Sequence, residues 1–220
     1  MNNLSYTNKF YILSLNDKGK IPVSISTNVH ACLIAGGLME LMNAGIIAKD
    51  EKDRLTIQSE LPDEFHHLLP LYERISTAKK PKTIEKFAAD YLSGGKHLDH
   101  LLTNLKVTLV ANNYKEHMDF SFSGLVSFRT VYVPKEDVIF SIIDPIRDQF
   151  LRGGVLTDEV ICLTSLLDES KLLPEYFGNT EITKIRKTLA KMPASGTHAL
   201  AKKIIDETIT MLVVLTAIIT

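Results

Sequence analysis

Three groups of lysines lie where they could bind an anion. The first group flanks a tight turn, the second surrounds a proline at the expected start of a helix, and the third lies on a helix and at its end. Backbone N–H groups at a helix N-terminus would add to the attraction. Either two groups share one face and form an anion site, or each is solvated separately at the surface. The groups are Lys18 and Lys20, Lys79, Lys80 and Lys82, and Lys106 and Lys115.

The histidines and one glutamate are the residues that could serve a metal or an enzyme. His97 and His100 are three residues apart, a spacing that can hold zinc, but a third ligand would have to come from elsewhere. We therefore expect these two, and the pair His66 and His67, to be polar surface residues without a metal. Glu40 lies in an apolar helix, where a buried carboxylate needs a partner. We expect a structural role for Glu40, with catalysis as the alternative.

The common catalytic motifs are absent from the sequence. No serine lies in a Gly-x-Ser-x-Gly motif, and the glycine pairs lack the spacing of phosphate-binding or dinucleotide-binding loops. Cys32 and Cys162 lie in apolar helical contexts, which is typical of buried, reduced thiols in a cytosolic protein. We expect no catalytic residue, no cofactor and no enzymatic activity.

The composition is typical of one globular domain over residues 1–220. Hydrophobic residues make up 45% of the chain and charged residues 23%, and the net charge of −1 argues against non-specific binding of nucleic acid. The N-terminus has no basic stretch followed by an apolar run, so we expect no signal peptide and a cytoplasmic location. The most apolar stretch, residues 211–219, is shorter than the roughly 20 residues of a membrane-spanning helix.

Glycines, prolines and N-cap residues divide most of the chain into helices with apolar stripes. We expect Pro70 to kink or break one helix and Pro145 to bend another. A small β-hairpin is expected over residues 46–57, around a charged turn. The fold class is therefore mainly α, with a compact helical core and small β-hairpins. The expected helices cover residues 29–44, 62–75, 81–93, 98–111, 137–151, 158–167, 180–192 and 197–220.

A second, longer hairpin is expected from Phe120 to Val133, where apolar and polar residues alternate around Gly124. Its apolar residues are too many for a solvated ribbon, and an isolated two-stranded hairpin is marginal in water. The hairpin must therefore pack on the body of the protein, on a second copy of the chain, or into lipid. Its candidate residues for membrane or subunit contact are Phe120, Phe122, Leu125, Val126 and Phe128.

Three short motifs occur in a characteristic order before the longer hairpin. They are Leu13-Ser-Leu-Asn-Asp-Lys-Gly19, Glu40-Leu-Met-Asn-Ala-Gly45 and Pro62-Asp-Glu-Phe-His-His-Leu-Leu69. With the elements that follow, they resemble the Golgi phosphoprotein 3 family over nearly the whole chain. The resemblance implies a mostly helical fold with a protruding hydrophobic hairpin. Eukaryotic members of that family bind phosphatidylinositol 4-phosphate on Golgi membranes, while the compact length here is more similar to a prokaryotic relative.

The resemblance also implies where a lipid headgroup would bind. The family's pocket uses a tryptophan and three arginines, and these positions fall near Ile25, Ile34, Thr103 and Lys106. Of the four, Lys106 keeps a positive charge.

Together these observations lead to one expected function and two alternatives. We expect a non-enzymatic peripheral membrane protein that binds anionic lipid headgroups, with phosphatidylinositol 4-phosphate as the ligand implied by the resemblance. Lys106, helped by Lys18, Lys20 and Lys115, would contact phosphate, and the long hairpin would enter the membrane or join copies of the chain. The alternatives are a soluble homo-oligomeric scaffold or adaptor that uses the hairpin without a lipid ligand, and an enzyme that uses the glutamate or the histidine pair above.

Overall fold

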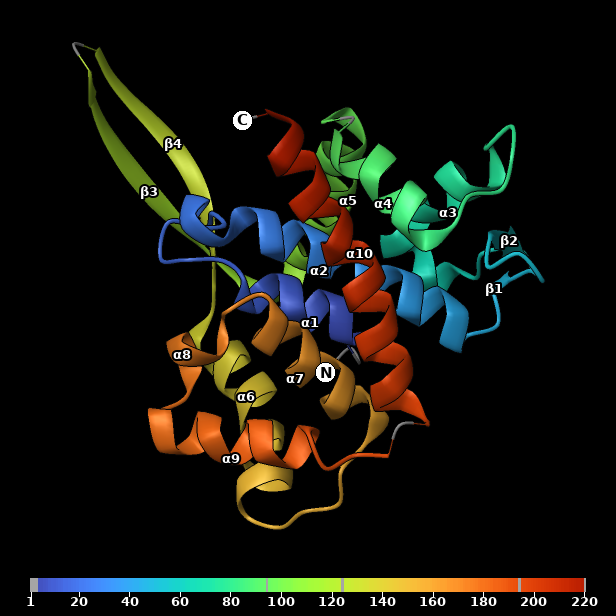
Figure 1. Cartoon of the computed structure of the whole chain (residues 1–220). Coiled ribbons are helices and arrows are strands. Elements are labelled where there is room, and N and C mark those ends of the chain that lie inside the picture. The colour runs from blue at the N-terminus through green and yellow to red at the C-terminus, as the bar shows by residue number, and fades with distance from the viewer. Residues whose placement is uncertain (1–3, 94, 124, 194, 220) are drawn as a thin grey trace.

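The protein is a helical body with two β-hairpins, which confirms the expected mainly α fold (Figure 1). The computed structural model describes residues 4–93, 95–123, 125–193 and 195–219, and side chains within 4–107 and 133–210. Helices η1 and η2 below are 3-10 helices. In chain order the described elements are α1 (Tyr6–Leu13), η1 (Val23–Ile25), α2 (Ser26–Asn43), β1 (Ile47–Lys49), β2 (Leu55–Ile57), η2 (Asp63–Leu68), α3 (Leu69–Ser76), α4 (Ile84–Ser93), α5 (Lys96–Asn113), β3 (Tyr114–Ser123), β4 (Leu125–Pro134), α6 (Glu136–Leu151), α7 (Asp158–Glu169), α8 (Leu173–Tyr176), α9 (Asn179–Leu189) and α10 (Thr197–Ile219).

Helix α2 forms the centre of the body because it is apolar on all sides. From Ala31 to Leu41 every residue is buried, and the helix contacts α1, α4, α7 and α10. Gly45 ends the helix with a φ of 68°, and the N–H of Ile46 donates to the carbonyl of Leu41 at 2.9 Å. Within the described residues, Val23–Asn43 is the one helical stretch long and apolar enough to cross a membrane, and 67% of its most apolar 18-residue window is buried in the fold.

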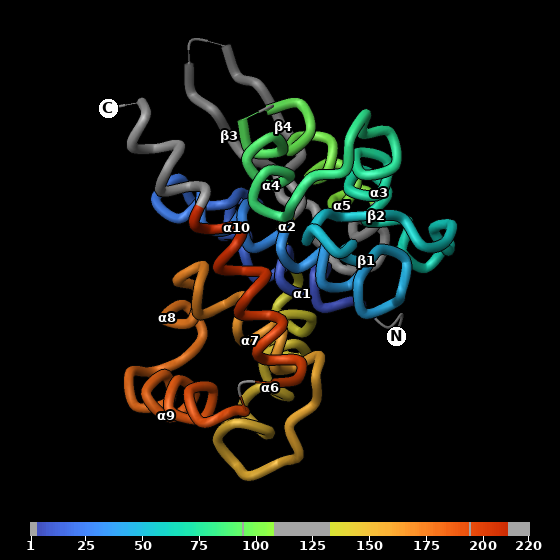
Figure 2. The backbone as a smooth tube through the Cα atoms, turned by 45° about the vertical axis from the view of Figure 1, so that its right-hand side comes forward, coloured from blue at the N-terminus to red at the C-terminus, as the bar shows by residue number. Residues whose placement is uncertain are grey.

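The C-terminal helix α10 packs against the helical body. It packs along α2, α4 and α7, and Figure 2 shows it running beside α2 and α7. Ala201, Ile204 and Ile205 are almost fully buried in this contact. The apolar residues 211–219 continue the same helix, and their side chains lie outside the described part of the chain.

The helix expected from Pro62 is divided in the structure, and a helix near the N-terminus was not expected. The run from Pro62 divides into η2 and α3, with Pro70 in the first turn of α3, where its missing N–H has no helical partner to lose. The expected break at Pro70 is therefore confirmed. Helix α1, which was not expected, begins at the N-cap Ser5, whose hydroxyl accepts the N–H of Asn8.

Both hairpins are antiparallel, and the second is longer than expected. Strands β1 and β2 pair Ile47 with Ile57, as the sequence indicates. Strands β3 and β4 pair from Tyr114 opposite Pro134 to Ser123 opposite Leu125. The first half of β3 is polar and has no clear alternation, which is why the sequence shows only the second half. The side chains of the candidate contact residues from Phe120 to Phe128 lie outside the described part of the chain.

Candidate functional site

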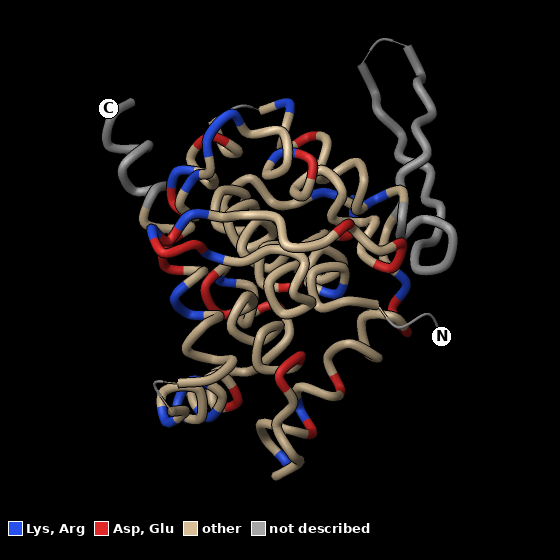
Figure 3. Tube along the Cα trace, turned by 90° about the vertical axis from the view of Figure 1, so that its right-hand side faces the viewer, with Lys and Arg blue, Asp and Glu red and all other residues tan. Residues whose placement is uncertain are grey.

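A basic concave surface lies between the end of α3 and the start of α4. Six cationic side chains of the described residues line a cavity of about 600 Å³, and no described carboxylate lines it. We call it the basic cavity. Figure 3 looks onto the side of the molecule that carries α3 and the β1–β2 hairpin. The cationic residues of the basic cavity are Arg54, Arg74, Lys79, Lys80, Lys82 and Lys86.

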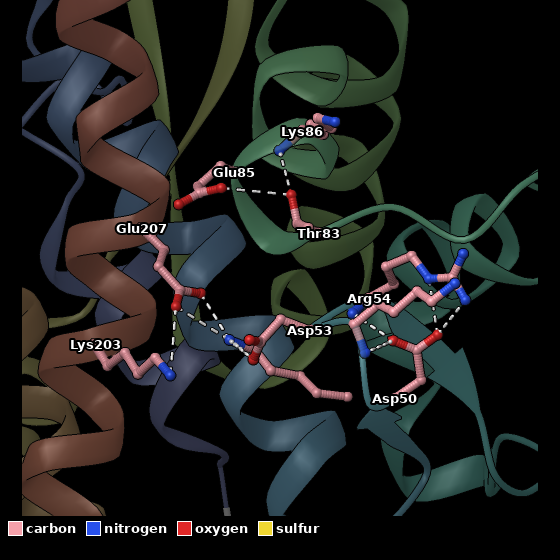
Figure 4. A network of polar contacts seen from close by, with 10 residues as sticks. Asp50, Asp53, Arg54, Thr83, Glu85, Lys86, Lys203 and Glu207 are labelled. Carbon is pink, nitrogen blue, oxygen red and sulfur yellow. Dashed lines mark hydrogen bonds and ion pairs between the residues drawn. The ribbon is translucent and has the colours of Figure 1, made fainter.

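The loop that carries three of these lysines is tied to the neighbouring hairpin by backbone contacts. The N–H of Leu55 donates to the carbonyl of Lys82 at 2.8 Å, and Arg54 forms an isolated β-bridge with Thr83. The hydroxyl of Thr83 accepts the N–H of Lys86 at 3.5 Å at the start of α4, as Figure 4 shows. The cavity is therefore held by β2 and α4 together.

Two carboxylates behind the cavity hold three of its cations in place. Asp50 binds Arg54 through a 2.8 Å bond from Nε and a 2.6 Å contact with Nη2, and these bonds lower the pKa of Asp50 to about 2. Asp90 pairs with Arg74 and, at 3.0 Å, with Lys82. Burial raises the pKa of Asp90, but the bonds from these two cations outweigh it and lower the pKa overall.

The sequence-predicted turn lysines are exposed on the opposite side of the molecule. Asn16 organises the turn, since its side-chain oxygen accepts the N–H groups of Lys18 at 2.9 Å and Lys20 at 3.0 Å. Both lysine side chains are exposed, and Val23, three residues further on, is 91% exposed. The turn between α1 and α2 and the loop between α3 and α4 lie at opposite edges in Figures 1 and 2.

Glu40 and His67 form a buried pair, which corrects the expectation that His67 lies at the surface. Each side chain is 4% exposed, and His67 Nε2 lies 2.9 Å from Glu40 Oε2 and 3.0 Å from the hydroxyl of Ser5. The other Glu40 oxygen accepts the N–H of Thr7 at 2.7 Å. His67 is buried because η2 packs it against α2, a contact between segments that the sequence alone does not pair.

This group has the residue types of a Ser-His-Glu triad but the wrong geometry. In such a triad the serine and the acid bind different imidazole nitrogens, so that the acid orients the ring while the other nitrogen takes the proton of the serine. Here both partners share Nε2. Burial is the main cause of the raised pKa of the neighbouring Tyr6 hydroxyl, and the charge of Glu40 raises this pKa further. The contacts of Glu40 are those of a structural carboxylate that satisfies the start of α1.

The other candidate residues for chemistry are dispersed. The described residues contain no group of three His, Cys, Asp or Glu side chains that could hold a metal ion. His100 and His66 are exposed, and the His97 ring lies 5.8 Å from that of Tyr91. Burial raises the pKa of the Cys32 thiol and raises that of Cys162 to about 12, so both stay protonated near neutral pH.

Comparison with protein families gives one match. The family model for Golgi phosphoprotein 3 (GPP34) matches residues 7–212. The chain belongs to the Golgi phosphoprotein 3 family. The search among curated proteins gave no match.

Family membership directs attention to the four positions of the Golgi phosphoprotein 3 lipid pocket. Ile34 is fully buried in α2 and Ile25 is half-buried, and their aliphatic side chains carry no hydrogen-bond donor for a headgroup. Thr103 and Lys106 are exposed on α5, with Val107 beside them 69% exposed. Leu101 and Leu105 turn the other face of this helix into the core. The side chain of Lys115 lies outside the described part of the chain.

Sequence reasoning found three of the four lysines of the basic cavity but missed Lys86 and the two arginines. Arg54 comes from the β1–β2 hairpin and Arg74 from α3, and nothing in their local sequence indicates a shared site. The available signal was Pro81 among three lysines. It marked a basic loop before a helix, whereas the arginines are added by the folding of β2 and α3 against that loop.

Proposed function

We propose that this protein is a peripheral membrane protein that binds anionic lipid headgroups and catalyses no reaction. Membership in the Golgi phosphoprotein 3 family carries the proposal, because that family is associated with membrane surfaces. The contacts with the headgroups come from Lys18 and Lys20 on the first turn and from Lys106 on α5, all of which are exposed. The membrane bound is one facing the cytoplasm.

Each contact supplies a basic residue and an exposed apolar residue. Val23 follows the turn lysines, and Val107 follows Lys106. A lysine near an anionic membrane surface contributes about 1 kcal/mol, and small apolar insertions add to that attraction. Three lysines therefore support reversible, salt-sensitive binding. Phosphatidylinositol 4-phosphate is the specific ligand suggested by the family, and Lys106 is the pocket position left to bind its phosphate.

Co-sedimentation with vesicles tests this proposal. Purified protein is mixed with neutral phosphatidylcholine vesicles, with vesicles that also contain phosphatidylserine, and with vesicles that contain phosphatidylinositol 4-phosphate. We expect binding to the anionic vesicles at low salt. At moderate salt the binding should be at least tenfold weaker, because ions screen the lysines. The variant K18E/K20E/K106E should lose binding to a similar extent. The matched control is K184E/K187E/K191E, which reverses three exposed lysines in and just after α9.

The outcome also distinguishes the second candidate function. Equal binding to neutral and anionic vesicles would contradict the electrostatic contact. Absence of binding to every vesicle would favour the soluble homo-oligomer joined through the β3–β4 hairpin. That candidate predicts self-association in sedimentation velocity, lost when Phe122 and Phe128 are replaced by Ser.

A further inference from the structure

We propose that the basic cavity is a second anion site, separate from the headgroup contacts above, and that it binds a phosphate monoester or pyrophosphate group. The cavity is formed by β2, α3, the loop between α3 and α4, and the start of α4. The lysines of the proposed headgroup contacts lie on the turn before α2 and on α5, and none of them lines the cavity.

The positive charge of the cavity exceeds the charge of the two carboxylates that pair with its cations. Asp50 and Asp90 pair with Arg54, Arg74 and Lys82. Six cations against these two carboxylates leave four positive charges. The nearby Glu85 lines a different cavity, on the α10 side, and its carboxylate accepts the hydroxyl of Thr83 at 3.5 Å.

Three lysines remain to bind a ligand. Lys79, Lys80 and Lys86 are exposed, and no carboxylate of the described residues lies within ion-pair distance of them. The paired cations behind them are held by Asp50 and Asp90. The cavity therefore combines a fixed basic wall with three adjustable ammonium groups, of which Lys86 lies in the first turn of α4, where the helix dipole also favours an anion.

The number of charges and the size of the cavity select the ligand class. A phosphate monoester carries close to two negative charges near neutral pH and three terminal acceptor oxygens, whereas a carboxylate carries one charge. The hydroxyls of Thr77 and Thr83 line the same cavity but donate to the carbonyl of Glu73 and the carboxylate of Glu85, so the ammonium groups supply the donors to the ligand. A volume of about 600 Å³ is that of a small-molecule site rather than a polymer groove. The phosphate group is either on a soluble metabolite or on a lipid headgroup.

Isothermal titration of the full chain with inorganic pyrophosphate at low salt tests the site. The cavity variant is K79Q/K80Q/K86Q, which removes exposed side chains and keeps the Asp50 and Asp90 pairs. The matched control is K184Q/K187Q/K191Q, which removes the same charge from the α9 region. We expect the wild type and the control to bind with the same Kd and the cavity variant to bind at least tenfold more weakly. Binding that is absent in the wild type, or unchanged in the cavity variant, would overturn the proposal.

Two further arms separate the sources of phosphate and the two proposals. Vesicles with phosphatidic acid, a phosphate monoester, are compared with phosphatidylserine vesicles of equal surface charge. A loss confined to phosphatidic acid in the cavity variant assigns a lipid source, and equal binding by wild type and variant assigns a soluble one. The K18E/K20E/K106E variant should keep its pyrophosphate affinity. If that affinity fell with the membrane binding, a separate site would be contradicted.

Discussion

At the scale of single residues, Glu40 connects three segments that are distant in the sequence. Its two oxygens bind the N–H of Thr7 in α1 and the ring of His67 in η2, while the residue itself lies in α2. The first N–H groups of a helix have no partner within the helix, and a negative charge is favourable there. Glu40 therefore acts as a cap for α1 supplied by another helix.

Replacing Glu40 tests this role through stability. We expect Glu40→Ala to lower the free energy of unfolding by about 2–3 kcal/mol, because it leaves buried donors unpaired. Urea denaturation followed by circular dichroism measures the change. Glu159→Ala is the control, since Glu159 also pairs with α1, through Lys9, but is 43% exposed and should cost no more than about 1 kcal/mol. Equal losses in the two variants would refute the capping role.

Gly37 lies where two neighbouring leucines leave no space for a side chain. A Cβ atom there would overlap Leu71 Cδ1 and lie 3.1 Å from Leu68 Cδ2. Both leucines are fully buried and cannot move aside into solvent. Gly37 therefore permits η2 and α3 to approach α2 closely.

We expect Gly37→Ala to destabilise the protein by about 1 kcal/mol. Overpacking costs about 1–3 kcal/mol, which exceeds the roughly 1 kcal/mol that alanine gains over glycine within a helix. Thermal unfolding measures the loss. Gly95→Ala is the matched control, because its Cβ would meet nothing within 4 Å and its stability should change by less than about 0.5 kcal/mol. A Gly37 variant as stable as the control would show that the leucines repack freely.

At the scale of elements, an ion pair joins the β1–β2 hairpin to the C-terminal helix. Lys49 Nζ lies 2.8 Å and 3.1 Å from the two oxygens of Glu207 on α10, and the two side chains are 16% and 20% exposed. Figure 4 shows Glu207 between Lys203 and the hairpin. Lys203 lies one turn earlier on α10, at 3.8 Å from Glu207.

A double-mutant cycle measures what this contact contributes to the docking of α10. We expect a coupling of about 1 kcal/mol between Lys49→Met and Glu207→Gln, since the pair is largely removed from solvent. The same cycle with Lys203→Met and Glu207→Gln should give less than about 0.5 kcal/mol, as for an exposed pair on one helix. A coupling of similar size in both cycles would mean that the Lys49–Glu207 pair stabilises the protein no more than the Lys203–Glu207 pair within α10.

At the scale of the whole molecule, the distribution of charge matters more than its sum. The chain has 25 Lys and Arg residues against 26 Asp and Glu residues, and a net charge of −1 gives no sign of an anion site. The fold nevertheless collects six cations around one cavity. A local field of this kind attracts anions within about one Debye length, roughly 8 Å at physiological salt, whatever the total charge.

Elements with local signals could be predicted from the sequence. The continuous apolar run of α2, the glycine at position 45 and the proline at position 70 each act on their neighbours within one or two turns, so the helices and their ends could be read directly. The family motifs are local for the same reason. Helix α1 was missed because it has only eight residues and because tertiary contacts bury Thr7 and Asn8, which no periodic pattern marks as core.

Contacts between residues that are distant in the sequence could be seen only in the tertiary structure. His67 was expected at the surface and is buried because Glu40 of another helix supplies its partner. Arg54 and Arg74 join the lysines around Pro81 because β2 pairs with the loop and α3 packs beside it. Contacts of this kind depend on how whole elements pack, and the free energy of that packing is spread over many buried side chains rather than encoded in the few residues that form a site.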